Sequence, residues 1–160
     1  MMHPSITIVV VREDPRIQDA QILLDESSAA FAIFSGDSGQ SRFRTEDLCS
    51  ARGEYLIART AQGEPLGCGA FRRFDYGVAE VTRIYSRQSR IGVGQAILQK
   101  LELGAVTAGY HTLITEAPSS NKRAVRFYEH NGFTPAAPFG VCAQSPGVCY
   151  FSKALCSITA

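Results

Sequence analysis

The sequence lacks an excess of charge of either sign. Its 160 residues contain 16 Lys and Arg against 15 Asp and Glu, which leaves a formal charge of +1 at pH 7. A near-neutral chain has no broad basic field of the kind that attracts a nucleic-acid backbone. We therefore expect no nucleic-acid partner, whereas a small basic pocket is compatible with this balance.

Long hydrophobic runs are also absent. The longest apolar run near the N-terminus, Ile6 to Val11, is far shorter than the ~20 residues that a membrane-spanning helix needs. No basic segment followed by an apolar stretch marks a signal peptide there. The sequence thus predicts a cytoplasmic protein without a membrane partner.

Cysteine and histidine are too few and too irregularly spaced for a metal site. The five cysteines are odd in number and form no Cys-X-X-Cys pair, and the three histidines add no ligand spacing. From this spacing we expect no metal. We also expect no disulfide framework, because thiols stay reduced in the cytoplasm.

The chain does have the composition of a globular domain, with 45% hydrophobic and 19% charged residues. Its length is typical of one domain, and no repeat or linker divides it. We expect residues 1–160 to form a single α+β domain.

Hydrophobic periodicity predicts strands and helices in mixed order. Asp14 and Pro15 predict the start of the first helix, as its N-cap and first helical residue. Three runs joined by short turns predict an antiparallel meander over 54–59, 66–73 and 78–86. Two further helices are predicted over 92–109 and 121–130, and three further strands over 111–115, at Phe133 and over 148–152.

The segment Arg90-Ile91-Gly92-Val93-Gly94-Gln95 lies between a predicted strand and a long helix. Its glycines allow backbone N–H groups to approach an anion, and the helix directs its unpaired amides and positive dipole end to the same point. The segment therefore predicts a phosphate or pyrophosphate site, although a plain strand-to-helix turn also fits this pattern.

Two other nucleotide-binding patterns fit less well. A dinucleotide fingerprint has its acidic residue about where Glu116 stands, but it needs a third glycine where this chain has Ile97. The strands before it also form a meander and not βαβ units. A P-loop is excluded because the chain has no Gly-Lys-Ser/Thr.

The segment 79–133 resembles the Gcn5-related N-acetyltransferase (GNAT) family of acyl-coenzyme A-dependent enzymes. Ser89-Arg90-Ile91-Gly92-Val93-Gly94 is similar to the family's Gln/Arg-X-X-Gly-X-Gly/Ala, and an amphipathic helix follows it. Downstream, Asn121-X-X-Ala124-X-X-Phe127-Tyr128 is similar to the family's second cofactor segment. Ser89 departs from the usual Gln or Arg, and Arg90 beside it is a candidate for the missing charge.

This resemblance implies a three-layer α/β/α fold. Its mixed, mostly antiparallel sheet has about six to seven strands, flanking helices and a splayed strand pair that holds acyl-coenzyme A. The implied cofactor is acetyl-CoA, held by Ile84, Tyr85, Ser86, Arg90, Ile91, Gly92, Val93, Gly94, Gln95, Asn121, Ala124 and Phe127. A homodimer is a common outcome in the family, and the sequence leaves it open.

The implied reaction is direct transfer of acetyl to an amine-bearing acceptor, either a small molecule or a peptide. Tyr128 is the candidate general acid for the leaving thiolate, and Glu80, or after it Glu116, is the candidate base. The arginines Arg72, Arg73 and Arg83 are candidates to hold an acidic acceptor or the cofactor's 3′-phosphate.

A second function class stays open at this point. The same fold without turnover would be a module that binds an acyl-coenzyme A or a protein partner. Release of free thiol with an amine discriminates the two, because a binding module releases none.

Overall fold

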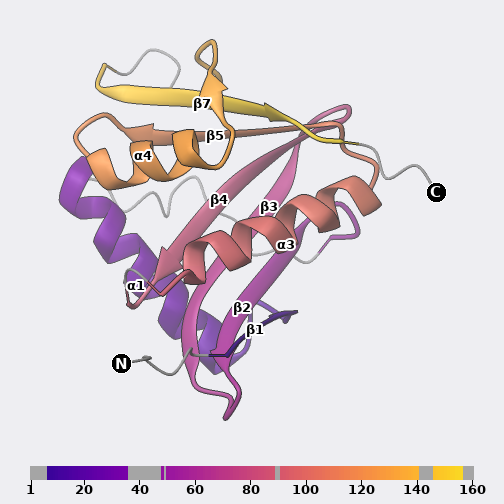
Figure 1. Cartoon of the computed structure of the whole chain (residues 1–160), viewed down its shortest axis with the longest axis vertical. Coiled ribbons are helices and arrows are strands. Elements are labelled where there is room, and N and C mark those ends of the chain that lie inside the picture. Colours follow the sequence, from indigo (N-terminus) through magenta and orange to yellow (C-terminus); the bar gives the residue numbers. More distant parts are fainter. Residues whose placement is uncertain (1–6, 36–47, 49, 89–90, 141–145, 157–160) are drawn as a thin grey trace, which may run out of the picture.

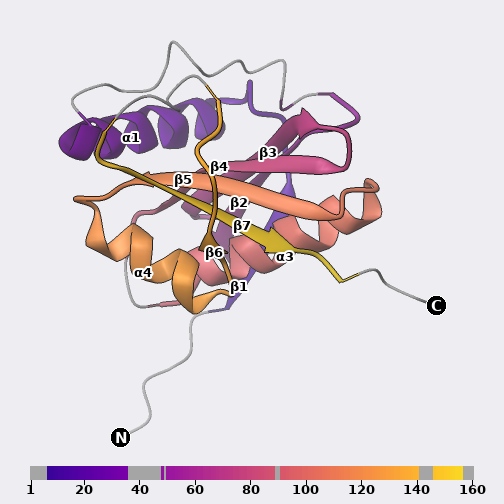
Figure 2. The same ribbon diagram turned by 90° about the horizontal axis from the view of Figure 1, so that it is seen from above.

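The computed structural model shows a seven-stranded sheet with helices on both of its faces (Figures 1 and 2). It describes residues 7–35, 48, 50–88, 91–140 and 146–156. The strands are β1 (Ile8–Arg12), β2 (Glu54–Thr60), β3 (Pro65–Asp75), β4 (Val78–Ser86), β5 (Thr112–Pro118), β6 (Thr134–Pro135) and β7 (Val148–Ala154). The helices that it describes in full are α1 (Gln18–Ser35), α3 (Val93–Thr107) and α4 (Lys122–His130).

The sheet has the order β1-β2-β3-β4-β5-β7-β6, and each neighbouring pair except β4 and β5 is antiparallel. In Figure 2, α1 covers one face of the sheet, and α3 and α4 cover the other. The expected three-layer fold with a mixed, mostly antiparallel sheet is therefore confirmed.

Each face of the sheet has its own apolar core, as the period-2 alternation of a strand requires. In β2, Leu56 and Ala58 belong to the cluster that packs under α3, whereas Tyr55 and Ile57 belong to the cluster under α1. The α3 helix contributes the buried residues Val93, Ile97, Leu98, Leu101 and Ala105.

The first helix begins later than predicted. Residues 15–17 form a turn, and α1 starts at Gln18. The Asp14 carboxylate accepts from the backbone N–H and the guanidinium of Arg16, and the side chain of Gln21 reaches back to the Pro15 carbonyl at 2.8 Å. Asp14 therefore stabilises the turn before the helix and does not cap the helix itself.

A β-bulge interrupts β4 near its middle. Cys68 of β3 lies opposite Tyr85 and Ala70 lies opposite Thr82, so two β4 residues, Arg83 and Ile84, face the single residue between them on β3. Arg83 has a positive φ of 61°. The extra residue shifts the alternation, so that Ile84 packs towards the α3 core and Arg83 lies on the α1 side.

The β4 and β5 strands separate soon after they begin. Only Val78 to Glu80 pair with β5, where the last pair joins Glu80 to Ile114. Beyond this point β5 pairs with β7 while β4 continues beside β3, and Figure 1 shows the two strands diverging. The predicted splayed strand pair is present, and we call this place the β4–β5 fork.

Candidate active site

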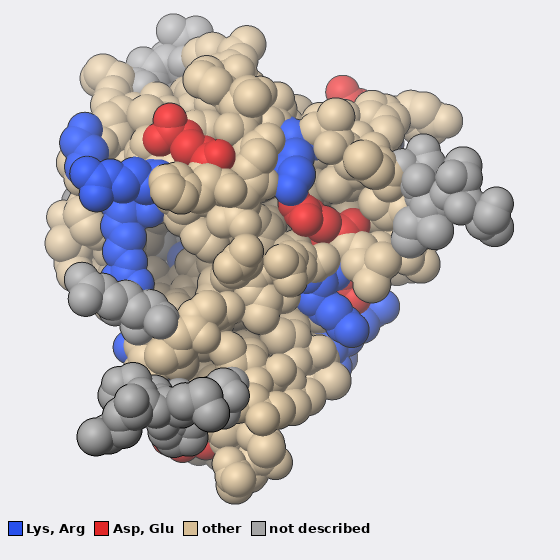
Figure 3. Space-filling model, in the orientation of Figure 1, with Lys and Arg blue, Asp and Glu red and all other residues tan. Residues whose placement is uncertain are grey.

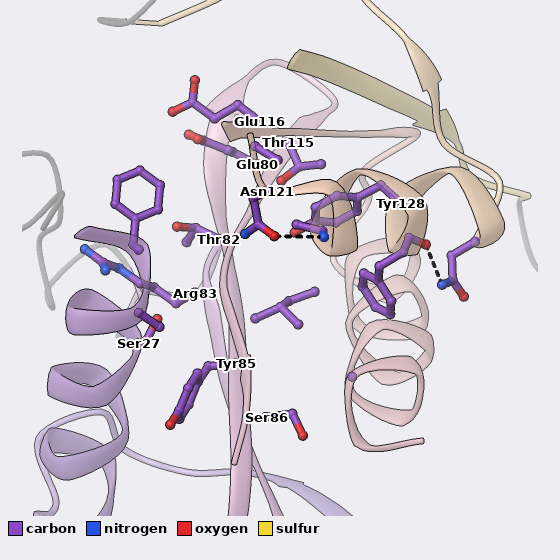
Figure 4. Close-up of a pocket in the computed structure, with 18 of the residues that line it drawn as sticks. Ser27, Glu80, Thr82, Arg83, Tyr85, Ser86, Thr115, Glu116, Asn121 and Tyr128 are labelled. Carbon is purple, nitrogen blue, oxygen red and sulfur yellow. Dashed lines mark hydrogen bonds between the residues drawn. The ribbon is translucent and has the colours of Figure 1, made fainter. Parts of the chain in front are cut away.

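A cavity of about 1100 Å³ opens at the β4–β5 fork. Its walls come from α1 on one side and from α3 and α4 on the other, with β4 between them (Figure 4). Basic side chains gather over α4 beside a hollow in the molecular surface (Figure 3). The exposed lysine and arginine residues of this helix are Lys122, Arg123 and Arg126, and Arg123 lines the cavity.

The N-terminus of α3 faces the cavity without a side-chain cap. Gly92 is the N-cap residue, with a φ of 83°, and no side chain bonds to the first turn. A Cβ built on Gly92 would meet no atom within 4 Å, so the space in front of it is open. The first amides of a helix have no intrahelical partners, and this end therefore has the geometry of an anion site.

Most of the predicted cofactor residues line this one cavity. They are Ile84, Tyr85, Ser86, Gly92, Val93, Gly94, Gln95, Asn121, Ala124 and Phe127, and the predicted catalytic residues Glu80 and Tyr128 join them. Ile91 packs against the core outside the lining set. Ser89 and Arg90 lie outside the described residues. That Arg90 supplies the charge missing at Ser89 therefore stays a prediction.

Local hydrogen bonds fix both ends of α4. The Asn121 side chain accepts from the backbone N–H of Ala124 at 3.1 Å, and it therefore caps the helix start. At the other end, the Asn131 side chain donates to the Phe127 carbonyl at 2.8 Å. These bonds hold the aromatic residues of α4 in place against the fork.

Tyr128 is the buried residue of α4, with 7% of its surface exposed. Its ring makes edge contacts with Phe127 and Phe133, each with centroids 5.3 Å apart. Burial raises the pKa of its hydroxyl, the charge of Glu80 raises it further, and a hydrogen bond with Thr115 partly opposes both. The phenol thus keeps its proton at and above neutral pH, as a proton donor must.

Thr115 links β5 to β4 at the point where the fork opens. Its buried hydroxyl donates to the Val81 carbonyl at 3.0 Å, one residue beyond the last ladder pair between β4 and β5. This bond is not predictable from a local sequence pattern, because it joins residues 34 positions apart.

Replacing Thr115 by Val should lower stability. The change keeps the side-chain shape but leaves the buried Val81 carbonyl without this donor, which costs about 1–3 kcal/mol and lowers Tm by several degrees in a domain of this size. Thr107→Val is the matched control, because Thr107 is exposed and its hydroxyl bonds only to its own helix. Equal Tm values for the two variants would show that the Thr115 bond does not stabilise the fork.

Glu80 lies in an ion pair at the mouth of the fork. Nε and Nη2 of Arg72 donate to one oxygen of Glu80 at 3.1 and 3.0 Å, and the Glu80 side chain is 12% exposed. The second candidate base, Glu116, also lines the cavity. The structure thus brings both carboxylates to the site and gives Glu80 a fixed orientation.

Sequence reasoning missed the aromatic wall of the cavity. Phe31 and Phe34 of α1, Phe74 of β3 and Phe139 all line it. The rings of Phe74 and Phe139 meet edge to face with centroids 5.3 Å apart. None of these residues belongs to a spaced motif, and only the tertiary fold brings them together.

The cysteines within the described ranges are free thiols. Cys68 is fully buried, and burial raises the pKa of its thiol to about 12. A thiol in this state is a poor nucleophile. In the same ranges no group of three His, Cys, Asp or Glu is arranged to hold a metal ion. No helix there is both long and apolar enough to cross a membrane.

Comparison with known proteins adds a sequence match over most of the chain. Residues 21–133 match the sequence model of the Acetyltransferase (GNAT) family. An IAA acetyltransferase of Azospirillum brasilense is 27% identical over 157 residues, which cover 95% of this chain and 99% of that protein.

Solved structures are similar in fold. A GNAT-family acetyltransferase of Staphylococcus aureus has a TM-score of 0.73 at 13% identity, with 94% of this chain and 100% of that chain covered. One from Elizabethkingia anophelis, with acetyl-CoA bound, has a TM-score of 0.67 at 15% identity, covering 92% and 98%.

Proposed function

The chain belongs to the GNAT family of acetyltransferases, and from this premise we propose that it transfers acetyl from acetyl-CoA to a primary amine of a small molecule or peptide. The observation that carries the proposal is the β4–β5 fork, which opens a cavity beside the uncapped start of α3. Acetyl-CoA bound to a protein of similar fold supports the choice of donor.

The residues at the fork fit such a donor. The amides of Val93, Gly94 and Gln95 at the start of α3 would hold its pyrophosphate, since Gly92 leaves the space before them open. Among the described residues, no strand pairs with β4 on its β5 side beyond Glu80, so backbone groups near Ile84 and Ser86 are placed to bind an extended pantetheine arm.

In the proposed reaction the acceptor nitrogen forms a C–N bond with the acetyl carbonyl carbon, and the C–S bond breaks. The backbone N–H near Ile84 would stabilise the negative charge that develops on the carbonyl oxygen. Tyr128 would give its proton to the departing thiolate sulfur. Glu80, with Glu116 as the second candidate, would accept the proton that the amine loses.

Free thiol release tests the proposal. The purified protein is mixed with acetyl-CoA and a panel of primary amines, and a chromogenic thiol reagent reports free coenzyme A. We expect release that depends on both the amine and the protein. Binding of acetyl-CoA without thiol release from any amine would instead support the non-catalytic binding module.

A further inference from the structure

The α1 side of β4 holds a chamber whose chemistry differs from that of the donor side. Figure 4 shows Arg83 and Ser27 on this side and Tyr128 and Asn121 on the other. The chamber walls include the phenylalanines Phe31, Phe34, Phe74 and Phe139. A compound that fills this space would therefore bury an apolar body of considerable size.

Arg83 projects into this chamber from the bulge, and its backbone is strained there. Its φ of 61° is the one positive value recorded for a non-glycine residue within the described ranges. Glycine or asparagine would adopt this conformation at lower cost. An arginine at a strained position that lines a cavity points to a use for its side chain.

The surroundings hold the Arg83 guanidinium in place. Its Nη1 donates at 3.0 Å to the hydroxyl of Ser28, which is buried on α1. Below the bulge, the Cys68 thiol donates to the Arg83 carbonyl at 3.4 Å. Both the backbone and the head group of Arg83 are thus positioned before any acceptor enters.

Charge in the cavity favours an anionic group. The charged residues that line it are Arg72, Arg73, Arg83 and Arg123 against Glu80 and Glu116. Glu80 balances the charge of Arg72 directly. Arg83 of β4 is the arginine that lies on the α1 side of the cavity, and a guanidinium binds a carboxylate through parallel N–H donors.

We propose that the acceptor is an amino acid with a large apolar or aromatic side chain, and that Arg83 binds its carboxylate. The phenylalanines of the chamber would enclose its side chain, and its amine would face the fork, where Glu80 and Tyr128 lie. This assignment of the acceptor class rests on the proposed acetyltransferase function.

Calorimetry with phenylalanine and its carboxamide tests the assignment apart from turnover. Both compounds carry the same amine and ring, and only the first carries a carboxylate. In the presence of coenzyme A, the wild type should bind the acid at least tenfold more tightly than the amide. Loss of a charge-assisted pair in Arg83→Gln should weaken binding of the acid by about tenfold to a hundredfold and leave the amide unchanged.

Two further variants sharpen this measurement. Arg83→Lys keeps the charge without the planar fork, so its affinity for the acid should lie between those of the wild type and Arg83→Gln. Arg12→Gln removes an exposed arginine from β1, outside the cavity, and should bind the acid like the wild type. A purely structural role for Arg83 would change the affinities for acid and amide alike.

Equal affinity of the wild type for acid and amide, or no binding of the acid, would overturn the assignment. Thiol release is measured in parallel with phenylalanine and with 2-phenylethylamine, which has the same ring and a primary amine but no carboxylate. Thiol release without preference for the acid would support the acetyltransferase function and contradict the assignment of the acceptor class. Acid binding that requires Arg83 without thiol release from any amine would support the site and contradict the proposed function.

Discussion

The Tyr128→Phe variant is expected to lose at least tenfold in kcat, while its affinity for acetyl-CoA stays within twofold of the wild type. The change removes only the hydroxyl, and a phenyl ring keeps the edge contacts with Phe127 and Phe133. General acid catalysis contributes ~10²–10⁴-fold to the reaction rate, so loss of the proton donor lowers the rate of the chemical step. Steady-state thiol release gives kcat, and calorimetry gives the affinity.

The pH dependence follows from the same residue. Burial raises the pKa of Tyr128 above its ordinary value of 10.0, so its neutral, proton-bearing form persists as the pH rises through that value. The acceptor amine, in contrast, becomes reactive as it loses its proton. Wild-type kcat/KM should therefore rise with pH and show no fall from tyrosine ionisation below pH ~10.

Tyr76→Phe is the matched control, because Tyr76 is 83% exposed and lies outside the cavity lining. It removes the same hydroxyl without touching the fork and should leave kcat unchanged. An unchanged kcat in Tyr128→Phe would remove Tyr128 from the mechanism.

The Gly92→Val variant should weaken acetyl-CoA binding at least tenfold. A β-branched residue at a φ of 83° costs about 1–2 kcal/mol in backbone strain. Its side chain would also stand in the open space where the donor's phosphates are proposed to lie against α3. Calorimetry measures the affinity, and thermal melting reports the loss of stability.

Gly109→Val separates these two effects. Gly109 follows the other end of α3 with a φ of 98°, and a Cβ there also meets nothing within 4 Å. This variant carries the same kind of strain far from the cavity, so Tm should fall similarly while acetyl-CoA affinity stays unchanged. Wild-type affinity in Gly92→Val would refute the phosphate site.

Much of the fold could be predicted because strong local signals mark its elements. The β4 strand was predicted over 78–86, as found, since the turn at Asp75-Tyr76-Gly77 precedes an uninterrupted strand pattern. The sequence pattern places the start of α1 too early because Asp14 bonds to Arg16, a choice of partner that the pattern does not reveal.

The candidate site was predictable where its residues follow one another along the chain. Gly92 to Gln95 and Asn121 to Tyr128 each form a short spaced motif that the fold carries intact to the cavity. Phe31 and Phe139 have no such spacing, since packing alone brings these distant positions to one chamber. The strained backbone of Arg83 could not be predicted from its sequence neighbours, because the position of the bulge depends on how β4 pairs with β3.

Calorimetric titration of the purified protein with acetyl-CoA, with NADH as the control nucleotide, tests the central claim most directly. We expect saturable binding of acetyl-CoA at micromolar concentrations, weakened in Gly92→Val and unaffected in Gly109→Val, and no binding of NADH. Absence of acetyl-CoA binding, or equal binding of NADH, would contradict the claim that the β4–β5 fork and the start of α3 form an acyl-coenzyme A site.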